Sequence, residues 1–305
     1  MGEDKTLNKD AKMKKDDASS APEKKKVQKD EKKDEMTEED RRLQEDLEML
    51  VKRLDESNVS LYQPSLETMR ALIRASTTSM TSVPKPLKFM RPHFGKMKEI
   101  HEKMSEGPVK HLCADIISVL AMTSGDKNDC INYRMKGTHE PIGDWGHEYV
   151  RHLAMEMAEE WRSLPDDAEE GRRFALLKLV KEIVSHNMKH NAEVEACDLL
   201  FEIERLDLLI DFVEEVDHQR VCLYLLSCSP LTPDPDNQIL ITTAKDVYLK
   251  FNKPFEALRC AVMLNDVSMI REIFLSTKDL LIQKQMAILL GRQQVFLELE
   301  GVGNG

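Results

Sequence analysis

Ser76–Phe94 reads STTSMTSVPKPLKFMRPHF and interrupts a sequence whose apolar residues otherwise follow helical spacing. The serine and threonine side chains at its start compete with the backbone for hydrogen bonds, which disfavours helix propagation. Pro84 and Pro86 remove two amide donors and favour extended backbone at Val83 and Lys85. A helix therefore cannot run through this stretch, and separate elements are expected on either side of it.

The same stretch is too apolar for a solvated linker, because Leu87, Phe89 and Met90 closely follow the prolines. We predict an ordered connector that is pressed onto a helical surface. Two interpretations are open for its centre: it bridges two helices of this chain, or it contacts another subunit. Under the second interpretation, the candidate contact residues are Met80, Val83, Pro84, Lys85 and Pro86.

Apolar residues on both sides of the connector recur every three or four positions, which is the spacing of one helix face. The first stripe runs from Leu43 to Leu54 and follows an N-cap expected at Thr37. Asp144 is predicted to cap a helix that carries both Trp145 and Trp161. The apolar stripes of the predicted helices span residues 37–54, 64–75, 94–104, 108–120 (with a C-terminal cap expected at Gly125), 144–161, 176–183, 196–203, 206–213, 220–228, 239–251, 255–264, 267–275 and 280–290.

The connections between these helices are mostly short, which favours antiparallel neighbours. No segment alternates apolar and polar residues between turn signals, so no strand is predicted. We therefore predict an all-α fold, an irregular α-solenoid of antiparallel helical hairpins over residues 37–299. Residues 1–36 are rich in Lys, Asp and Glu, and are predicted to form a disordered charged tail.

The charge distribution argues against nucleic-acid binding. The chain has a formal net charge of −11, and residues 1–36 hold 11 Lys against 10 acidic residues (+1), so the remainder carries −12. A body this acidic lacks the basic face that binds a phosphate backbone. Lys24–Lys26 is compatible with a nuclear-import or nucleic-acid patch, but the acids between the lysines favour a solvated tail.

The cysteine pattern and the hydropathy indicate the compartment. Six cysteines are scattered without a Cys-x-x-Cys pair, which indicates reduced thiols in a cytosolic or nuclear protein. No apolar run approaches the roughly 18 residues that span a bilayer, and the N-terminus is too charged for a signal peptide. We predict a soluble protein of the cytoplasm and nucleus, with no membrane partner.

Four side chains of metal-ligand type recur on one predicted helical face, at His186, His190, Glu193 and Cys197. However, Asn187 stands where a His-Glu-x-x-His hydrolase has its glutamate base. The favoured interpretation is a mixed polar stripe that a neighbouring helix partly covers. A metal-dependent hydrolase is the remote alternative.

Other candidate chemistry is weaker. His147 and His152 are five residues apart, so their side chains diverge by about 140° around a helix and cannot share one ion. Neither a Gly-rich nucleotide loop nor a Gly-x-Ser-x-Gly elbow occurs. We predict no catalytic, cofactor-binding or metal-binding residue and no enzymatic activity. Trp145, Trp161 and Tyr149 are expected in the core, with an exposed partner anchor as the alternative.

A set of short motifs resembles, in order and spacing, the N-terminal portion of one family. That family is the largest non-ATPase scaffold subunit in the base of the 26S proteasome regulatory particle (regulatory subunit 2). The resemblance covers about Thr37–Leu299, while Glu300–Gly305 falls outside it. The motifs are the connector, Asp115–Thr123, Trp145–Ala154, His190–Glu193, Glu195–Leu200, Met263–Asp266 and Gln283–Ala287.

This resemblance implies a non-catalytic scaffold that supports proteasome assembly and ubiquitin-dependent protein degradation, beside the ATPase ring of the base. Members of the family also dock ubiquitin-like shuttle proteins and a deubiquitinase. Those docking surfaces lie on a later toroid of repeats that the resemblance does not reach, so no ubiquitin-binding residue is assigned. The rival hypothesis is an α-solenoid adaptor of another multiprotein assembly, such as a vesicle coat or a signalling scaffold.

Overall fold

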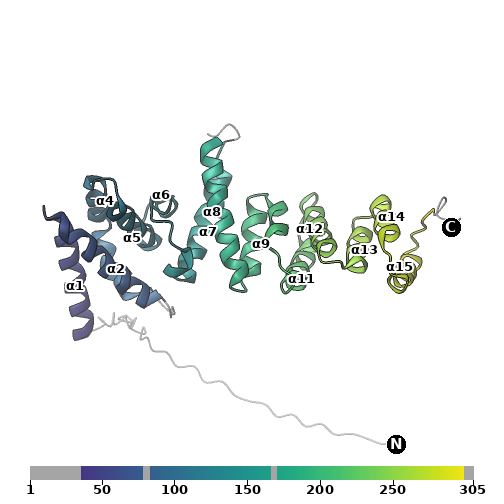
Figure 1. The fold of residues 1–305 in the computed structure, drawn as a ribbon, viewed down its shortest axis with the longest axis horizontal. Coiled ribbons are helices and arrows are strands. Elements are labelled where there is room, and N and C mark those ends of the chain that lie inside the picture. Colours follow the sequence, from purple (N-terminus) through teal and green to yellow (C-terminus); the bar gives the residue numbers. More distant parts are fainter. Residues whose placement is uncertain (1–35, 78–82, 166–169, 299–305) are drawn as a thin grey trace, which may run out of the picture. The chain divides into compact units, whose positions relative to one another are not determined.

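The computed structural model of the 305-residue chain describes residues 36–77, 83–165 and 170–298. Every regular element within these residues is a helix, which confirms the predicted all-α class (Figure 1). The helices belong to one unit, Glu38–Gly305. The predicted charged tail, apart from Met36, lies outside the described residues.

The helices follow one another through short connections, several of which contain single 3₁₀ turns. The first part of the chain forms α1 (Glu38–Asp55), α2 (Tyr62–Thr77), α3 (Lys85–Met90), α4 (Phe94–Lys103), α5 (Pro108–Ser124), α6 (Asp129–Met135), α7 (His147–Ser163) and α8 (Glu170–Lys189). The remainder forms α9 (Glu193–Glu202), α10 (Leu209–Phe212), α11 (His218–Cys228), α12 (Asp236–Lys250), α13 (Pro254–Met263), α14 (Val267–Ser276) and α15 (Leu280–Arg292). The 3₁₀ turns are η1 (Val59–Leu61), η2 (Arg91–His93), η3 (Ile142–Trp145), η4 (Leu206–Leu208) and η5 (Ser229–Leu231).

The helices pack chiefly against their neighbours in the sequence. The most extensive contacts join α12 to α13, α5 to α6, α11 to α12 and α8 to α9 (Figure 1). One continuous core contains buried residues from Leu47 to Cys260, and a second core joins α13, α14 and α15. Burial between successive neighbours is the packing of an α-solenoid, as the sequence predicts.

Helix α1 illustrates how the apolar stripes are used. Leu47, Leu50 and Leu54 are buried against the core, on the face that the spacing predicts. Full burial of one such side chain contributes about 1.5–3 kcal/mol. The first turn carries Glu38, Glu39 and Asp40, whose negative charges complement the positive end of the helix dipole.

Three hairpin turns are closed in the same way by an asparagine. Helices α8, α12 and α13 each end two residues before an asparagine of positive φ, and the next helix begins two residues after it. Asparagine adopts this left-handed conformation more readily than most residues, and it ends the helix there. The three residues are Asn191 (φ 56°), Asn252 (φ 54°) and Asn265 (φ 53°).

Hydrogen bonds across the same turns satisfy carbonyls that the helix ends would otherwise leave unpaired. In each turn the amide after the asparagine donates to a carbonyl five residues before it. The N···O distances are 2.9 Å for Ala192 to Asn187, 2.9 Å for Lys253 to Tyr248 and 3.2 Å for Asp266 to Ala261. Two of these turns coincide with the His190–Glu193 and Met263–Asp266 motifs.

The connector after α2 is partly helical. Pro84 has φ −54° and ψ 137°, and α3 begins at the next residue, so the prediction of extended backbone at Lys85 is wrong. Pro86 lies in the first turn, where a helix does not use the amide hydrogen that proline lacks. The short helix buries Leu87 and Met90 completely, which offsets the unfavourable backbone at a residue before proline.

The segment before α7 also differs from its prediction. Helix α7 begins at His147 after Gly146, whose φ of 94° favours glycine, so Asp144 does not cap it. Trp145 therefore lies on η3 and not on one helix with Trp161. A side chain at Gly146 would also meet Thr77, because a Cβ there would lie 3.1 Å from the Thr77 Cβ.

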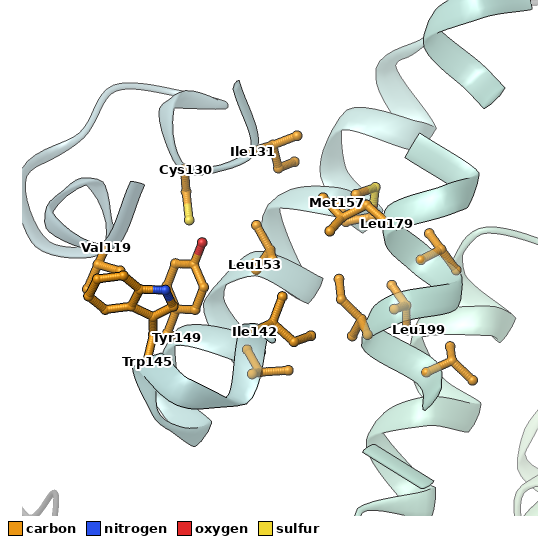
Figure 2. Packing of buried hydrophobic residues seen from close by; sticks show 14 of the residues in the cluster. Val119, Cys130, Ile131, Ile142, Trp145, Tyr149, Leu153, Met157, Leu179 and Leu199 are labelled. Carbon is orange, nitrogen blue, oxygen red and sulfur yellow. The ribbon is translucent and has the colours of Figure 1, made fainter. Parts of the chain in front are cut away.

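Trp145 and Tyr149 both lie in the core, as predicted, although from different elements (Figure 2). The Tyr149 hydroxyl lies 2.8 Å from the Ser118 Oγ, which in turn donates to the Cys130 carbonyl at 2.7 Å. This chain of hydrogen bonds joins α5, α6 and α7, and it satisfies polar groups that burial would otherwise leave unpaired. Trp161 is only partly buried at the edge of the same core.

Candidate partner-binding surface

The connector presents two of its five predicted contact residues to solvent. Val83 is 45% exposed, and the Lys85 side chain is 61% exposed, whereas Pro84 and Pro86 are buried within this chain. Met80 lies outside the described residues. We call Val83 and Lys85 the connector surface.

The connector surface is held in place from both sides. The Lys85 Nζ lies 2.7 Å from the Asp40 Oδ1, which ties the start of α3 to the first turn of α1. Beneath it, Leu87 and Met90 are fully buried against the core. Sequence reasoning does not find the Lys85–Asp40 ion pair, because nothing local links two residues on separate helices.

A cluster of charged residues joins α2 to the segment before α7. Arg70 Nη1 lies 2.9 Å from Glu140 Oε1, and Arg74 pairs with the other oxygen of the same carboxylate. Arg74 also lies 3.6 Å from Asp144 and stacks over Trp145, with 4.6 Å from its Cζ to the ring centroid. These ion pairs hold Glu140 and the following turn η3 against α2. Asp144 is thus an ion-pair partner of Arg74.

A second cluster surrounds Arg134, which is 1% exposed on α6. Its Nη2 donates to the Glu182 Oε1 of α8 and to the Glu140 backbone carbonyl, both at 2.7 Å. Its Nη1 lies 3.9 Å from the equally buried Asp115 of α5. Asp115 in turn accepts a hydrogen bond from the Thr138 amide at 3.0 Å. One buried guanidinium thus connects α5, α6 and α8.

The four predicted side chains of metal-ligand type do not converge. Helix α8 ends at Lys189, so Glu193 and Cys197 lie on α9 and do not continue the face of His186 and His190. Glu193 pairs with Arg220 of α11, and Cys197 is 1% exposed in the core. Among the described residues, no group of three His, Cys, Asp or Glu side chains could hold a metal ion.

The histidines meet in other ways. The rings of His186 and His190 stack with centroids 4.0 Å apart. His147 borders the same cleft as these two rings, whereas the Nε2 of His152 lies 3.4 Å from Glu156 on the same helix. His147 and His152 therefore have separate surroundings, as their spacing predicts.

All six cysteines are free thiols, and all except Cys228 are buried. Burial raises the pKa of Cys113 and Cys222 to about 12 and that of Cys260 to about 11. Burial also raises the pKa of Cys130 and Cys197. These five thiols stay protonated at neutral pH and act as small apolar side chains, because the thiolate is the reactive form.

No helix within the described ranges combines the length and the apolar character that crossing a membrane requires.

Comparison with known proteins gives one consistent result. The family described as RPN1 N-terminal domain matches residues 47–304, which include most of the C-terminal end left outside the resemblance above. An Arabidopsis thaliana protein named 26S proteasome non-ATPase regulatory subunit 2 homolog B is 44% identical over 260 residues, or 85% of this chain and 29% of that protein. The Dictyostelium discoideum 26S proteasome non-ATPase regulatory subunit 2 is 42% identical over 259 residues, or 84% of this chain and 29% of that protein.

A third relative extends the match slightly. The Neurospora crassa 26S proteasome regulatory subunit rpn-1 is 41% identical over 270 residues, or 88% of this chain and 30% of that protein. The chain thus spans 29–30% of the length of these three relatives.

Proposed function

The chain belongs to the RPN1 N-terminal domain family, and from this we propose that it is a non-catalytic scaffold subunit in the base of the 26S proteasome regulatory particle. In that role it supports assembly and ubiquitin-dependent protein degradation in the cytoplasm and nucleus. The observation that carries the proposal is the 44% identity over 85% of this chain to a relative named as a proteasome non-ATPase regulatory subunit.

The fold is well suited to that role. A solenoid buries each helix against its neighbours and leaves a long surface available for other subunits. The Arg134–Glu182 pair joins α6 to α8, and the Arg70–Glu140 pair joins α2 to the segment before η3, so these pairs resist changes in helix geometry that would misplace a bound subunit. Fold alone does not distinguish this scaffold from an adaptor of another assembly, so the choice rests on the family.

Affinity purification of the tagged full-length chain from cells tests the proposal. We expect subunits of the proteasomal ATPase ring to copurify in constant proportion to the chain, and the tag alone to capture none of them. Recovery of vesicle-coat or signalling subunits, without any proteasome subunit, would contradict the proposal and favour the rival adaptor.

We further propose that the connector surface contacts another subunit of the base. Val83 is an apolar side chain that this chain leaves half exposed, and Lys85 is a neighbouring cation on a rigid helix start. Subunit interfaces combine an apolar core with a polar, solvent-accessible rim, and Val83 and Lys85 offer one side chain of each kind. Pro84 and Pro86 fix the backbone beneath them, which limits the entropy lost on binding.

The double substitution Val83→Ala/Lys85→Ala is expected to weaken association with the base about tenfold, because it removes the apolar contact and the charge together. The melting temperature is expected to fall by no more than about 2 °C, since both side chains are largely solvated and an exposed ion pair contributes about 0–1 kcal/mol. Quantitative pull-down and thermal unfolding measure the two effects.

Val59→Ala/Lys96→Ala is a matched control for this experiment. Val59 is 67% exposed, and Lys96 pairs with Asp55 of α1 at 3.0 Å, so the control removes the same two residue types and a comparable ion pair. Association is expected to stay within about twofold of the unsubstituted chain. Equal losses of association in the two double variants would refute the interface.

A further inference from the structure

A cleft of about 610 Å³ opens between η3 and the turn from α8 to α9. His147, His186 and His190 contribute imidazole rings to its wall, and Asp144 and Glu195 contribute carboxylates. We call these five side chains the histidine cleft. The metal-site hypothesis singled out two of the histidines, but neither the scaffold role nor the connector surface uses them.

Two of the imidazoles stack face to face, which leaves the outer face of the pair for a further planar group. The rings of His186 and His190 stack with an interplanar angle of 25° and 4.0 Å between centroids. The Nδ1 of His190 lies 2.7 Å from the backbone carbonyl of His186, which fixes the orientation of the second ring.

The backbone of η3 holds the first ring. A Cβ at Gly143 would lie 2.2 Å from the His186 Cε1, so only glycine lets the imidazole approach this closely. The stack is therefore organised before any partner arrives, and a ligand loses little free energy in ordering it.

The charges around the stack favour a cation. Burial lowers the pKa of His186, and the nearby His190 and His147 lower it further, so this imidazole is neutral at pH 7. Glu195 makes no ion pair within the part of the chain that the structure describes. The carboxylates of Asp144 and Glu140 are balanced by Arg74 and Arg70, so the negative charge left over at the cleft is that of Glu195.

The geometry points to the guanidinium group of an arginine, presented by a partner protein, as the occupant of the histidine cleft. A planar guanidinium can stack on the outer face of the imidazole pair while it donates hydrogen bonds to the Glu195 carboxylate. This requires no metal and no chemical step. The inference concerns a surface separate from the connector, and it does not depend on the proposed role in the proteasome.

The protein already contains this arrangement next to the cleft. Arg74 stacks on Trp145, with 4.6 Å from its Cζ to the ring centroid, while it forms ion pairs with Glu140 and Asp144. Arg173 likewise stacks on Trp161, with 5.5 Å from its Cζ to the ring centroid. Lysine fits the cleft less well, because its compact ammonium is more strongly hydrated and does not stack as a plane.

Histidine NMR signals of the full chain provide the test, with Nα-acetyl-arginine methylamide as the probe. We expect saturable shifts of the Cε1–H signals of His186 and His190, with a dissociation constant on the order of 1–10 mM. The lysine analogue is expected to bind about fivefold more weakly. The citrulline analogue, which has a similar shape but no charge, is expected to give no saturable shift.

Two substitutions locate the binding. Glu195→Gln and His190→Ala are each expected to raise the dissociation constant about fivefold, since each removes one interaction of about 1 kcal/mol. Glu45→Gln, which removes an exposed acid on α1, serves as the control and is expected to change the constant by less than about twofold. The melting temperatures of the three variants show whether each remains folded.

Three results would overturn the inference. The first is an equal shift with the citrulline analogue, and the second is unchanged arginine binding in a folded Glu195→Gln chain. The third is stoichiometric binding of zinc chloride to the two imidazoles with no arginine binding, which would identify a metal site instead.

Discussion

Replacing Arg134 by alanine is expected to lower the free energy of unfolding by about 3–5 kcal/mol, because it leaves a buried charge without its partner. Asp115 is 1% exposed, so its carboxylate keeps the hydrogen bond from Thr138 but loses the cation that offsets its charge in the core. The Glu140 carbonyl also loses its donor. The loss of the ion pair is less unfavourable for Glu182, because its side chain is 37% exposed and can be hydrated.

Urea unfolding followed by far-ultraviolet circular dichroism measures this effect. Arg42→Ala is the control, since Arg42 is 77% exposed and lies 3.9 Å from the equally solvated Glu38 one turn away. Its effect is expected within about 0.5 kcal/mol of zero. Arg134→Ala/Asp115→Asn is expected to recover part of the loss, because it removes the uncompensated charge. A single variant as stable as the control would disprove the role assigned to Arg134.

Trp145→Ala is also expected to lower the free energy of unfolding by about 3–5 kcal/mol, but for a different reason. The ring is 1% exposed in the core and belongs to η3, which packs against α2, α7 and α8. Truncation would leave a cavity in the core and remove the surface on which Arg74 stacks. The loss therefore combines apolar burial with one cation–π contact.

Trp161→Ala is the matched control for this second substitution, because the chain has only these two tryptophans. Trp161 is partly buried and contacts Arg173, so water can fill the space that it leaves. We expect Trp161→Ala to lower the free energy of unfolding by less than half as much as Trp145→Ala. This change is the shift in the urea midpoint multiplied by one m-value common to both variants. Equal losses would show that the burial of Trp145 contributes no more to stability than that of Trp161.

The contacts of Arg134 and Trp145 do not follow from the sequence, although much of the fold does. Met97 and Ile100 on α4, and Leu176, Val180 and Ile183 on α8, are all buried on the faces that their spacing predicts. Helix periodicity is a local property, because residues three and four apart share one face whatever else the chain does. The candidate contact residues rest on the same kind of local pattern, and among those that the structure describes, Val83 and Lys85 are exposed whereas Pro84 and Pro86 are buried.

The asparagine turns also have a local signal in the sequence. Each of Asn191, Asn252 and Asn265 follows the last helical residue by two positions, and a search for that spacing would have located three hairpins. The start of α7 offered a weaker signal. Asp144 is a plausible helix cap by residue type, and only its contact with Arg74 on another helix assigns it elsewhere.

The sequence by itself determined the helical class, the break after α2 and the stacking of successive hairpins, because proline constraints, turn residues and apolar spacing all act within a few residues. Tertiary structure alone decided which charges meet. Arg74 pairs with Glu140, which lies 66 residues later in the sequence, and Arg134 pairs with Glu182, which lies 48 residues later. Ion pairing depends on distance in space and on the exclusion of water, and neither is set until distant helices have packed. The same holds for the histidine cleft, whose rings and carboxylates come together only when η3 packs against α8.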